Sequence, residues 1–143
     1  MVTEQEPGAG ALQGYRVLDL SEPWGAYCGK LLADLGADVV KVEPPAGDPA
    51  RALGPFKGDQ AHPEASLTFA YYHTNQRSVV LDLADDEGRS LLARLLGAAD
   101  VLLETFPPER AAALGLDYAA LHARHPRLVV SSLSGFGGRS SGR

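Results

Sequence analysis

The sequence has few of the features that mark secreted or membrane proteins. Its 143 residues include a single cysteine, Cys28, which has no internal partner for a disulfide. No apolar run approaches the roughly 18 residues that a membrane-spanning helix needs. Residues 1–15 contain neither the basic segment nor the apolar segment of a signal peptide. We therefore expect a cytoplasmic protein without membrane contact, in which residues 1–13 form a flexible tail.

Positive charge is also scarce. The chain has 13 Lys and Arg residues against 18 Asp and Glu residues, a net charge of −5. Such a chain repels nucleic acid, so we expect no nucleic-acid partner, and an anionic ligand would have to be held by locally placed arginines or backbone N–H groups. The composition, 45% hydrophobic and 22% charged, is typical of one ordinary globular domain.

Short apolar runs alternate with stretches of helical spacing along the chain. The runs predict strands over residues 16–20, 38–43, 77–83, 100–104 and 127–133. Between them, Ser66 and Asp117 are suited to begin helices, and Gly36 and Gly115 to end them. Residues 44–63 are rich in Pro, Gly and charge and predict a long surface loop. The alternation predicts an α/β fold, a mainly parallel sheet with flanking helices.

In such a sheet, ligands bind at the carboxyl ends of the strands. The loops expected there are residues 21–27, 44 onward, 84–87, 105–109 and 134–138. None of them contains the G-x-G-x-x-G pattern of a dinucleotide site or the G-x-x-x-x-G-K-[ST] loop of an ATP site. We therefore expect neither NAD nor ATP as a ligand. Trp24, in the first loop, is expected either to stack on a ligand or to pack against the fold.

Several reactive side chains have a simpler structural interpretation. Cys28 lies near a helix start, where its pKa can fall, but a small residue packed against the sheet is the commoner case. His122 and His125 are three residues apart on a helix and lack a third ligand, so we expect no metal site. Asp85 and Asp86 are expected to cap the next helix.

Four blocks of the sequence occur in the order and spacing of a known family. They read RVLDLSEPWGAYCGKLLADLGADVVKVEPPAGDPAR, NQRSVVLDL, DEGRSLLARLLGAADVLLETF and LGLDYAALHARHPRLVVSSLSGFG. Over residues 14–138 the chain thereby resembles the class III coenzyme A transferases of the CaiB/BaiF type, which include formyl-CoA transferases and alpha-methylacyl-CoA racemases.

The resemblance implies a fold and a chemistry. Residues 14–143 would be the amino-terminal part of a Rossmann-like large domain, truncated at its C-terminal end, in a subunit that forms an interlocked homodimer. The family passes CoA between carboxylic acids through an acyl anhydride on an aspartate, which needs no metal or NAD. That aspartate lies beyond the GFG loop in the family, as does the His/Asp pair of the racemases. The resemblance therefore assigns no catalytic residue to this chain, which alone should be inactive; Asp19 and Cys28 would be the first candidates if it were active.

The family's CoA contacts map onto several positions here. The resemblance points to Leu81, Leu83, Thr105 and Phe106 for the adenine and its ribose phosphate. Arg77 fits a basic residue at the start of the third strand, with a surface ion pair as an equally weighted alternative, and Arg110 is placed to reach the same phosphate. Ala84, Pro107 and Ala113 stand where the family commonly has cations, so we expect weak CoA binding.

Alternative functions remain at this point. The chain is interpreted as a segment of an acyl-CoA:carboxylate CoA-transferase. It would also fit a CoA-thioester racemase fragment, a stand-alone CoA-binding or partner module completed by another chain, or a degenerate product without function. The resemblance indicates no particular acyl donor or acceptor.

Overall fold

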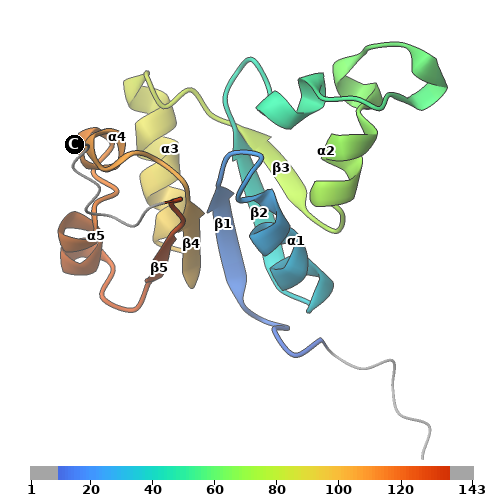
Figure 1. Cartoon of the computed structure of the whole chain (residues 1–143). Coiled ribbons are helices and arrows are strands. Elements are labelled where there is room, and N and C mark those ends of the chain that lie inside the picture. Colours follow the sequence, from blue (N-terminus) through green and yellow to red (C-terminus); the bar gives the residue numbers. More distant parts are fainter. Residues whose placement is uncertain (1–9, 136–143) are drawn as a thin grey trace, which may run out of the picture.

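The computed structural model describes residues 10–135 and contains one parallel sheet (Figure 1). Its strands are β1 (Arg16–Leu20), β2 (Asp38–Glu43), β3 (Arg77–Val80), β4 (Val101–Glu104) and β5 (Val129–Ser132). Their order is β3-β2-β1-β4-β5, and every neighbouring pair is parallel. The predicted α/β fold is thus confirmed. Most of the predicted tail and residues 136–138 of the last predicted loop lie outside the described residues; within residues 10–13, the Leu12 amide donates to the Leu35 carbonyl (2.9 Å).

Three strands are shorter than predicted, although β4 differs only by beginning at Val101 instead of at residue 100. β3 ends at Val80 because the segment after it turns, with the Asp82 carboxylate accepting a hydrogen bond from the Ala84 amide (2.9 Å). β5 begins at Val129, since the Leu128 amide still bonds to the His125 carbonyl in the preceding turn (3.0 Å). The long loop after β2 contains three short 3₁₀ helices, η1 (Pro49–Ala52), η2 (Lys57–Asp59) and η3 (Pro63–Ala65).

The α-helices are α1 (Ala26–Asp34), α2 (Leu67–Tyr72), α3 (Asp86–Leu96), α4 (Pro108–Ala113) and α5 (Tyr118–Arg124). Ser66 and Asp117 begin α2 and α5 as predicted, each accepting a backbone N–H at 3.0 Å. The capping prediction for α3 is wrong in detail. Asp85 occupies the N-cap position without a side-chain hydrogen bond, and Asp86 lies in the first turn and pairs with Arg89 at 2.5 Å.

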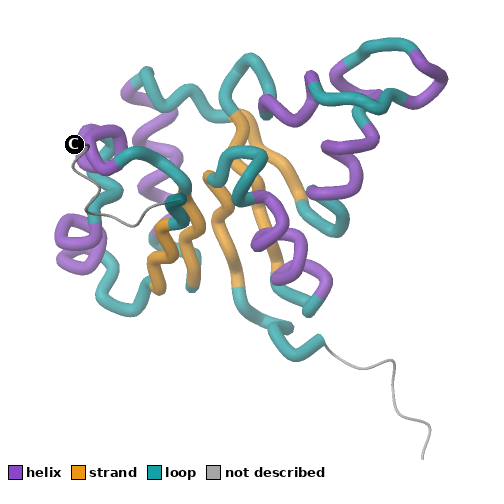
Figure 2. The backbone as a smooth tube through the Cα atoms, viewed as in Figure 1, coloured by secondary structure: helices purple, strands orange, loops and turns teal. Residues whose placement is uncertain are grey.

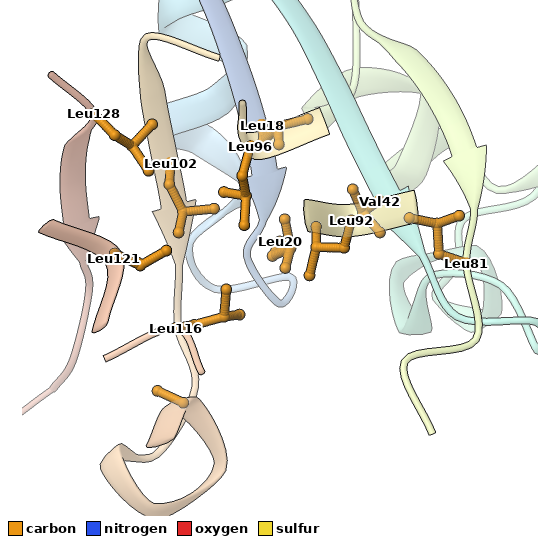
Figure 3. Packing of buried hydrophobic residues seen from close by; sticks show 11 residues of the cluster. Leu18, Leu20, Val42, Leu81, Leu92, Leu96, Leu102, Leu116, Leu121 and Leu128 are labelled. Atoms are coloured by element: carbon orange, nitrogen blue, oxygen red, sulfur yellow. The ribbon is translucent and has the colours of Figure 1, made fainter. Parts of the chain in front are cut away.

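The helices form a layer on each side of the sheet (Figures 1 and 2). Alternate residues of each strand face opposite layers, which separates two cores. The larger core lies under α3, α4 and α5 (Figure 3) and consists of Leu18, Leu20, Val42, Leu81, Leu92, Leu96, Leu102, Ala111, Leu116, Leu121 and Leu128. The smaller core lies under α1 and consists of Val17, Ala33, Ala37, Val39 and Leu103. In residues 10–135, no helix combines the length and the apolar character needed to cross a membrane.

Candidate functional site

The carboxyl ends of the parallel strands meet at one edge of the sheet, and a cavity of about 440 Å³ lies there. Its lining comes from the carboxyl ends of β1 and β2 with the segments after them, from the segment after β3, and from residues 106–114 in and around α4. Its lining residues are Leu20, Ser21, Glu22, Lys41, Val42, Glu43, Pro44, Asp48, Pro49, Leu81, Asp82, Leu83, Ala84, Phe106, Arg110 and Leu114.

Four of the six residues predicted to contact CoA line this cavity. Leu81 and Leu83 come from the turn after β3, while Phe106 and Arg110 come from the segment after β4 and from α4. The Arg110 guanidinium lies over the Phe106 ring, 4.4 Å from its centroid. The fold therefore brings two apolar side chains, an aromatic ring and a cation together, although up to 29 residues separate them in the sequence.

The other two predicted residues lie elsewhere. Arg77 begins β3 at the amino edge of the sheet, where its Nη2 contacts the Asp38 carboxylate at 2.5 and 2.7 Å. Of the two interpretations of Arg77, the structure contains the ion pair, and Arg77 is not among the residues that line the cavity. Thr105 is buried, and its Oγ1 accepts a hydrogen bond from the Glu22 amide (2.8 Å) instead of lining the cavity.

A buried lysine, which the sequence analysis missed, links two sides of the cavity. The Nζ of Lys41 lies 3.1 Å from Asp48 Oδ2 and 3.7 Å from Asp19 Oδ1, and it donates to the Ser21 carbonyl. Asp19 and Lys41 are register partners in β1 and β2, so their side chains share a face of the sheet. The signal in the sequence was a lysine within the otherwise apolar run Val39–Val42. Through these contacts with Ser21 and Asp48, Lys41 connects the loop after β1 to the loop after β2.

The first two candidate nucleophiles are poorly suited to that role. Asp19 is fully buried, and its Oδ1 accepts from both the amide (2.8 Å) and the hydroxyl (2.5 Å) of Ser21. Its Oδ2 has no hydrogen-bond partner among residues 10–135 and faces Gly29. Burial, reinforced by the nearby Asp19 carboxylate, raises the pKa of Cys28, which packs against the smaller core. Its thiol is therefore protonated and unreactive at neutral pH.

The cavity wall after β2 is held by a buried carboxylate. Glu43 accepts hydrogen bonds from Arg51 Nε (2.6 Å) and Nη2 (2.8 Å) and from the Asp48 amide (2.8 Å), as well as from the Ser78 hydroxyl. The Arg51 guanidinium and these donors lower the pKa of Glu43 to about 2. Arg51 also lies over the Phe69 ring, 3.7 Å from its centroid, so the ion pair connects β2, the loop and α2.

This carboxylate predicts a pH dependence of stability. Its folded-state pKa is lowered from 4.5 to about 2, so its stabilisation is fully present above about pH 4.5 and is lost as the pH falls toward 2. We expect the free energy of unfolding to decrease by about 3 kcal/mol over this range from Glu43 alone. The free energy of unfolding, measured with urea at several pH values, should fall less steeply with decreasing pH for Glu43→Gln than for the exposed control Glu87→Gln. If the unfolding free energies of the two variants depend equally on pH, Glu43 does not have this lowered pKa.

A second hollow of about 350 Å³ lies between the loop after β1 and α2. Pro23, Trp24, Tyr27, Tyr71 and Tyr72 line it, and Trp24 is 56% exposed. Trp24 therefore belongs to a different surface from Phe106 and Arg110. Within residues 10–135 there is no group of three or more His, Cys, Asp and Glu side chains placed to hold a metal ion.

The order β3-β2-β1-β4-β5 of parallel strands with flanking helices defines a Rossmann-like α/β domain, and the cavity lies at its carboxyl edge. Its sequence matches the family described as CoA-transferase family III over residues 12–143. The chain belongs to this family.

Relatives and solved structures agree with this assignment. The chain is 46% identical over 131 residues to the succinate–glutarate CoA-transferase of Agrobacterium fabrum, covering 88% of this chain and 32% of that protein. It is 41% identical over 123 residues to a subunit of the succinyl-CoA:(R)-benzylsuccinate CoA-transferase of Thauera aromatica, covering 86% of this chain and 30% of the relative. A CaiB/BaiF family protein from Brucella suis superimposes with a TM-score of 0.81 at 36% identity, covering 91% of this chain and 35% of that one. The chain thus spans about a third of the length of the relatives it matches.

Proposed function

We propose that this chain is a segment of an enzyme that transfers CoA between an acyl-CoA thioester and a carboxylic acid, and that it binds the CoA part. One observation carries the proposal: Leu81, Leu83, Phe106 and Arg110, which the family resemblance relates to CoA, line one cavity at the carboxyl edge. The cavity has the size range of small-molecule sites and is largely apolar with a few convergent polar groups.

In the proposed complex, Arg110 binds a phosphate of CoA, and the leucines with Phe106 form an apolar wall for the adenine. Lys41 is the other cation among the described lining residues, but it is buried and already paired with Asp19 and Asp48. The remaining charged lining groups are carboxylates, which repel the phosphates. Binding by this chain is therefore weak.

We also propose that this chain does not turn over CoA thioesters by itself. The two side chains first considered as nucleophiles are a fully buried aspartate, Asp19, and a protonated thiol, Cys28. The absence of a suited nucleophile at Asp19 and Cys28 also favours the alternative function, a CoA-binding module without catalysis. A racemase parent would use the same CoA cavity with different catalytic groups.

A cytoplasmic homodimer is the proposed state of the whole protein. Support for the homodimer comes from large apolar side chains that are exposed at helical spacing. They are Tyr27 and Leu31 of α1 and Leu35 directly after it. Leu67 and Tyr71 of α2 are exposed as well. Contiguous exposed apolar side chains are typical of surfaces that another protein segment covers.

Calorimetric titration with CoA tests the function. We expect saturable heat with a dissociation constant between high micromolar and millimolar, weakening as salt is added. Arg110→Ala should weaken binding by about tenfold, because a charge-assisted phosphate contact is lost. The control Arg94→Ala removes the same charge from the exposed end of α3, outside the cavity, and should have little effect. A folded sample that gives no heat at millimolar CoA, or equal affinities for both variants, would reject the proposed site.

A further inference from the structure

Backbone hydrogen bonds fix the position of Glu22 in the cavity lining. It follows β1, and its amide donates to the buried Oγ1 of Thr105 after β4 (2.8 Å). Its carbonyl accepts from the Gly25 amide (2.8 Å), which closes a turn. The backbone is thus fixed on both sides, and the turn presents the Glu22 side chain as part of the cavity lining.

The carboxylate of Glu22 faces the cation that the proposed function requires. Its Oε1 lies 3.7 Å from Arg110 Nη1, with side chains 46% and 56% exposed respectively. Arg110 also rests on the Phe106 ring. The guanidinium therefore already has an anionic partner among the lining residues of the cavity, and that partner comes from the segment after β1, whereas Arg110 comes from α4. An exposed pair at this distance is weak, so a more highly charged phosphate can replace the carboxylate.

We propose that Glu22 is a specificity-determining residue that competes with the ligand phosphate for Arg110. This inference rests on the proposed function. When no ligand is bound, Glu22 pairs with Arg110; a phosphate that enters the cavity displaces the carboxylate and is opposed by its charge. Glu22 therefore lowers the affinity for CoA and has no such effect on an uncharged ligand of the same cavity. Thr105, which orients Glu22 without touching the ligand, acts as a positioning residue.

The test compares Glu22→Gln with the wild-type chain in titrations with CoA and with adenosine, which keeps the adenine and lacks the phosphates. We expect the variant to bind CoA about two- to fivefold more tightly, the range set by an exposed ion pair, and to bind adenosine with unchanged affinity. Glu109→Gln is the matched control, because it removes the same charge next to Arg110 in the sequence but outside the cavity lining. In the Arg110→Ala background, Glu22→Gln should increase the affinity for CoA much less, because the arginine for which Glu22 and the phosphate compete is absent.

Different results would overturn different claims. If Arg110→Ala weakens CoA binding but Glu22→Gln does not strengthen it, Glu22 is no competitor and only this inference fails. An equal gain in CoA affinity for Glu109→Gln, or a gain in adenosine affinity for Glu22→Gln, would reveal a general effect of charge or packing and would likewise overturn it. If neither the wild-type chain nor Glu22→Gln binds CoA, the proposed function fails together with the inference.

Discussion

Replacing Lys41 with methionine is expected to lower the free energy of unfolding by about 3–5 kcal/mol. The substitution keeps the length and apolar stem of the side chain and removes the charge. Lys41 is 2% exposed, and Asp19 and Asp48 beside it are 0% and 4% exposed. Without the ammonium group, two carboxylates remain buried near each other with no compensating charge, which costs more than the ion pairs themselves contribute.

Urea unfolding followed by circular dichroism measures this effect. Lys57→Met is the control, because Lys57 is exposed in η2 and lies outside the cavity; its unfolding free energy should change by less than about 0.5 kcal/mol. Adding Asp48→Asn to Lys41→Met should recover part of the loss, since one of the uncompensated charges is removed. A Lys41→Met protein as stable as Lys57→Met would show that the buried network contributes nothing, and the account of the cavity walls would be wrong.

Replacing Gly88 with alanine should have the next largest effect. An added Cβ would lie 1.8 Å from the carbonyl oxygen of Asp82 and 2.6 Å from its carbonyl carbon. Both atoms belong to backbone, so neither side-chain rotation nor a small shift relieves the clash. We expect a loss of about 1–3 kcal/mol or more of stability. CoA binding should weaken as well, because Asp82 lies between Leu81 and Leu83 in the cavity wall.

Gly97→Ala provides the comparison within the same helix region. A Cβ there would lie 3.5 Å from the nearest atom, and Gly97 has helical torsion angles (φ −64°, ψ −18°) that alanine adopts readily. Its stability should stay the same or rise by a few tenths of a kcal/mol. If Gly88→Ala is as stable as Gly97→Ala and binds CoA normally, α3 does not pack on the turn after β3 as closely as described.

Local sequence patterns predicted the elements of the fold well. Runs rich in Val and Leu have few alternatives to buried strands, and β1 and β2 have the predicted bounds. Ser66 and Asp117 begin helices because their side-chain oxygens satisfy free backbone N–H groups at a helix start, a requirement that depends only on neighbouring residues. The carboxyl edge was predictable too, since parallel strands place their following loops together.

Contacts between distant segments were not predictable in this way. The partners of Lys41 depend on the register of β1 against β2 and on the path of the loop that returns Asp48 to the cavity. The bond between Thr105 and Glu22 joins residues 83 positions apart and requires β1 to lie beside β4. The position of Arg77, by contrast, was predictable from the topology of the sheet. As the first residue of a parallel strand, Arg77 had to lie at the amino edge, away from the cavity. The topology therefore favoured the ion pair over a phosphate contact.

The central claim is that CoA binds at the carboxyl edge of the sheet, and a titration followed by amide chemical shifts tests it most directly. As CoA is added to the ¹⁵N-labelled chain, we predict saturating shifts concentrated at Ser21, Glu22, Leu81–Ala84, Phe106 and Arg110, with little change at Arg77 or at the Trp24–Tyr71 hollow. Shifts centred on Trp24 and Tyr71, or none in a folded sample at millimolar CoA, would contradict the account.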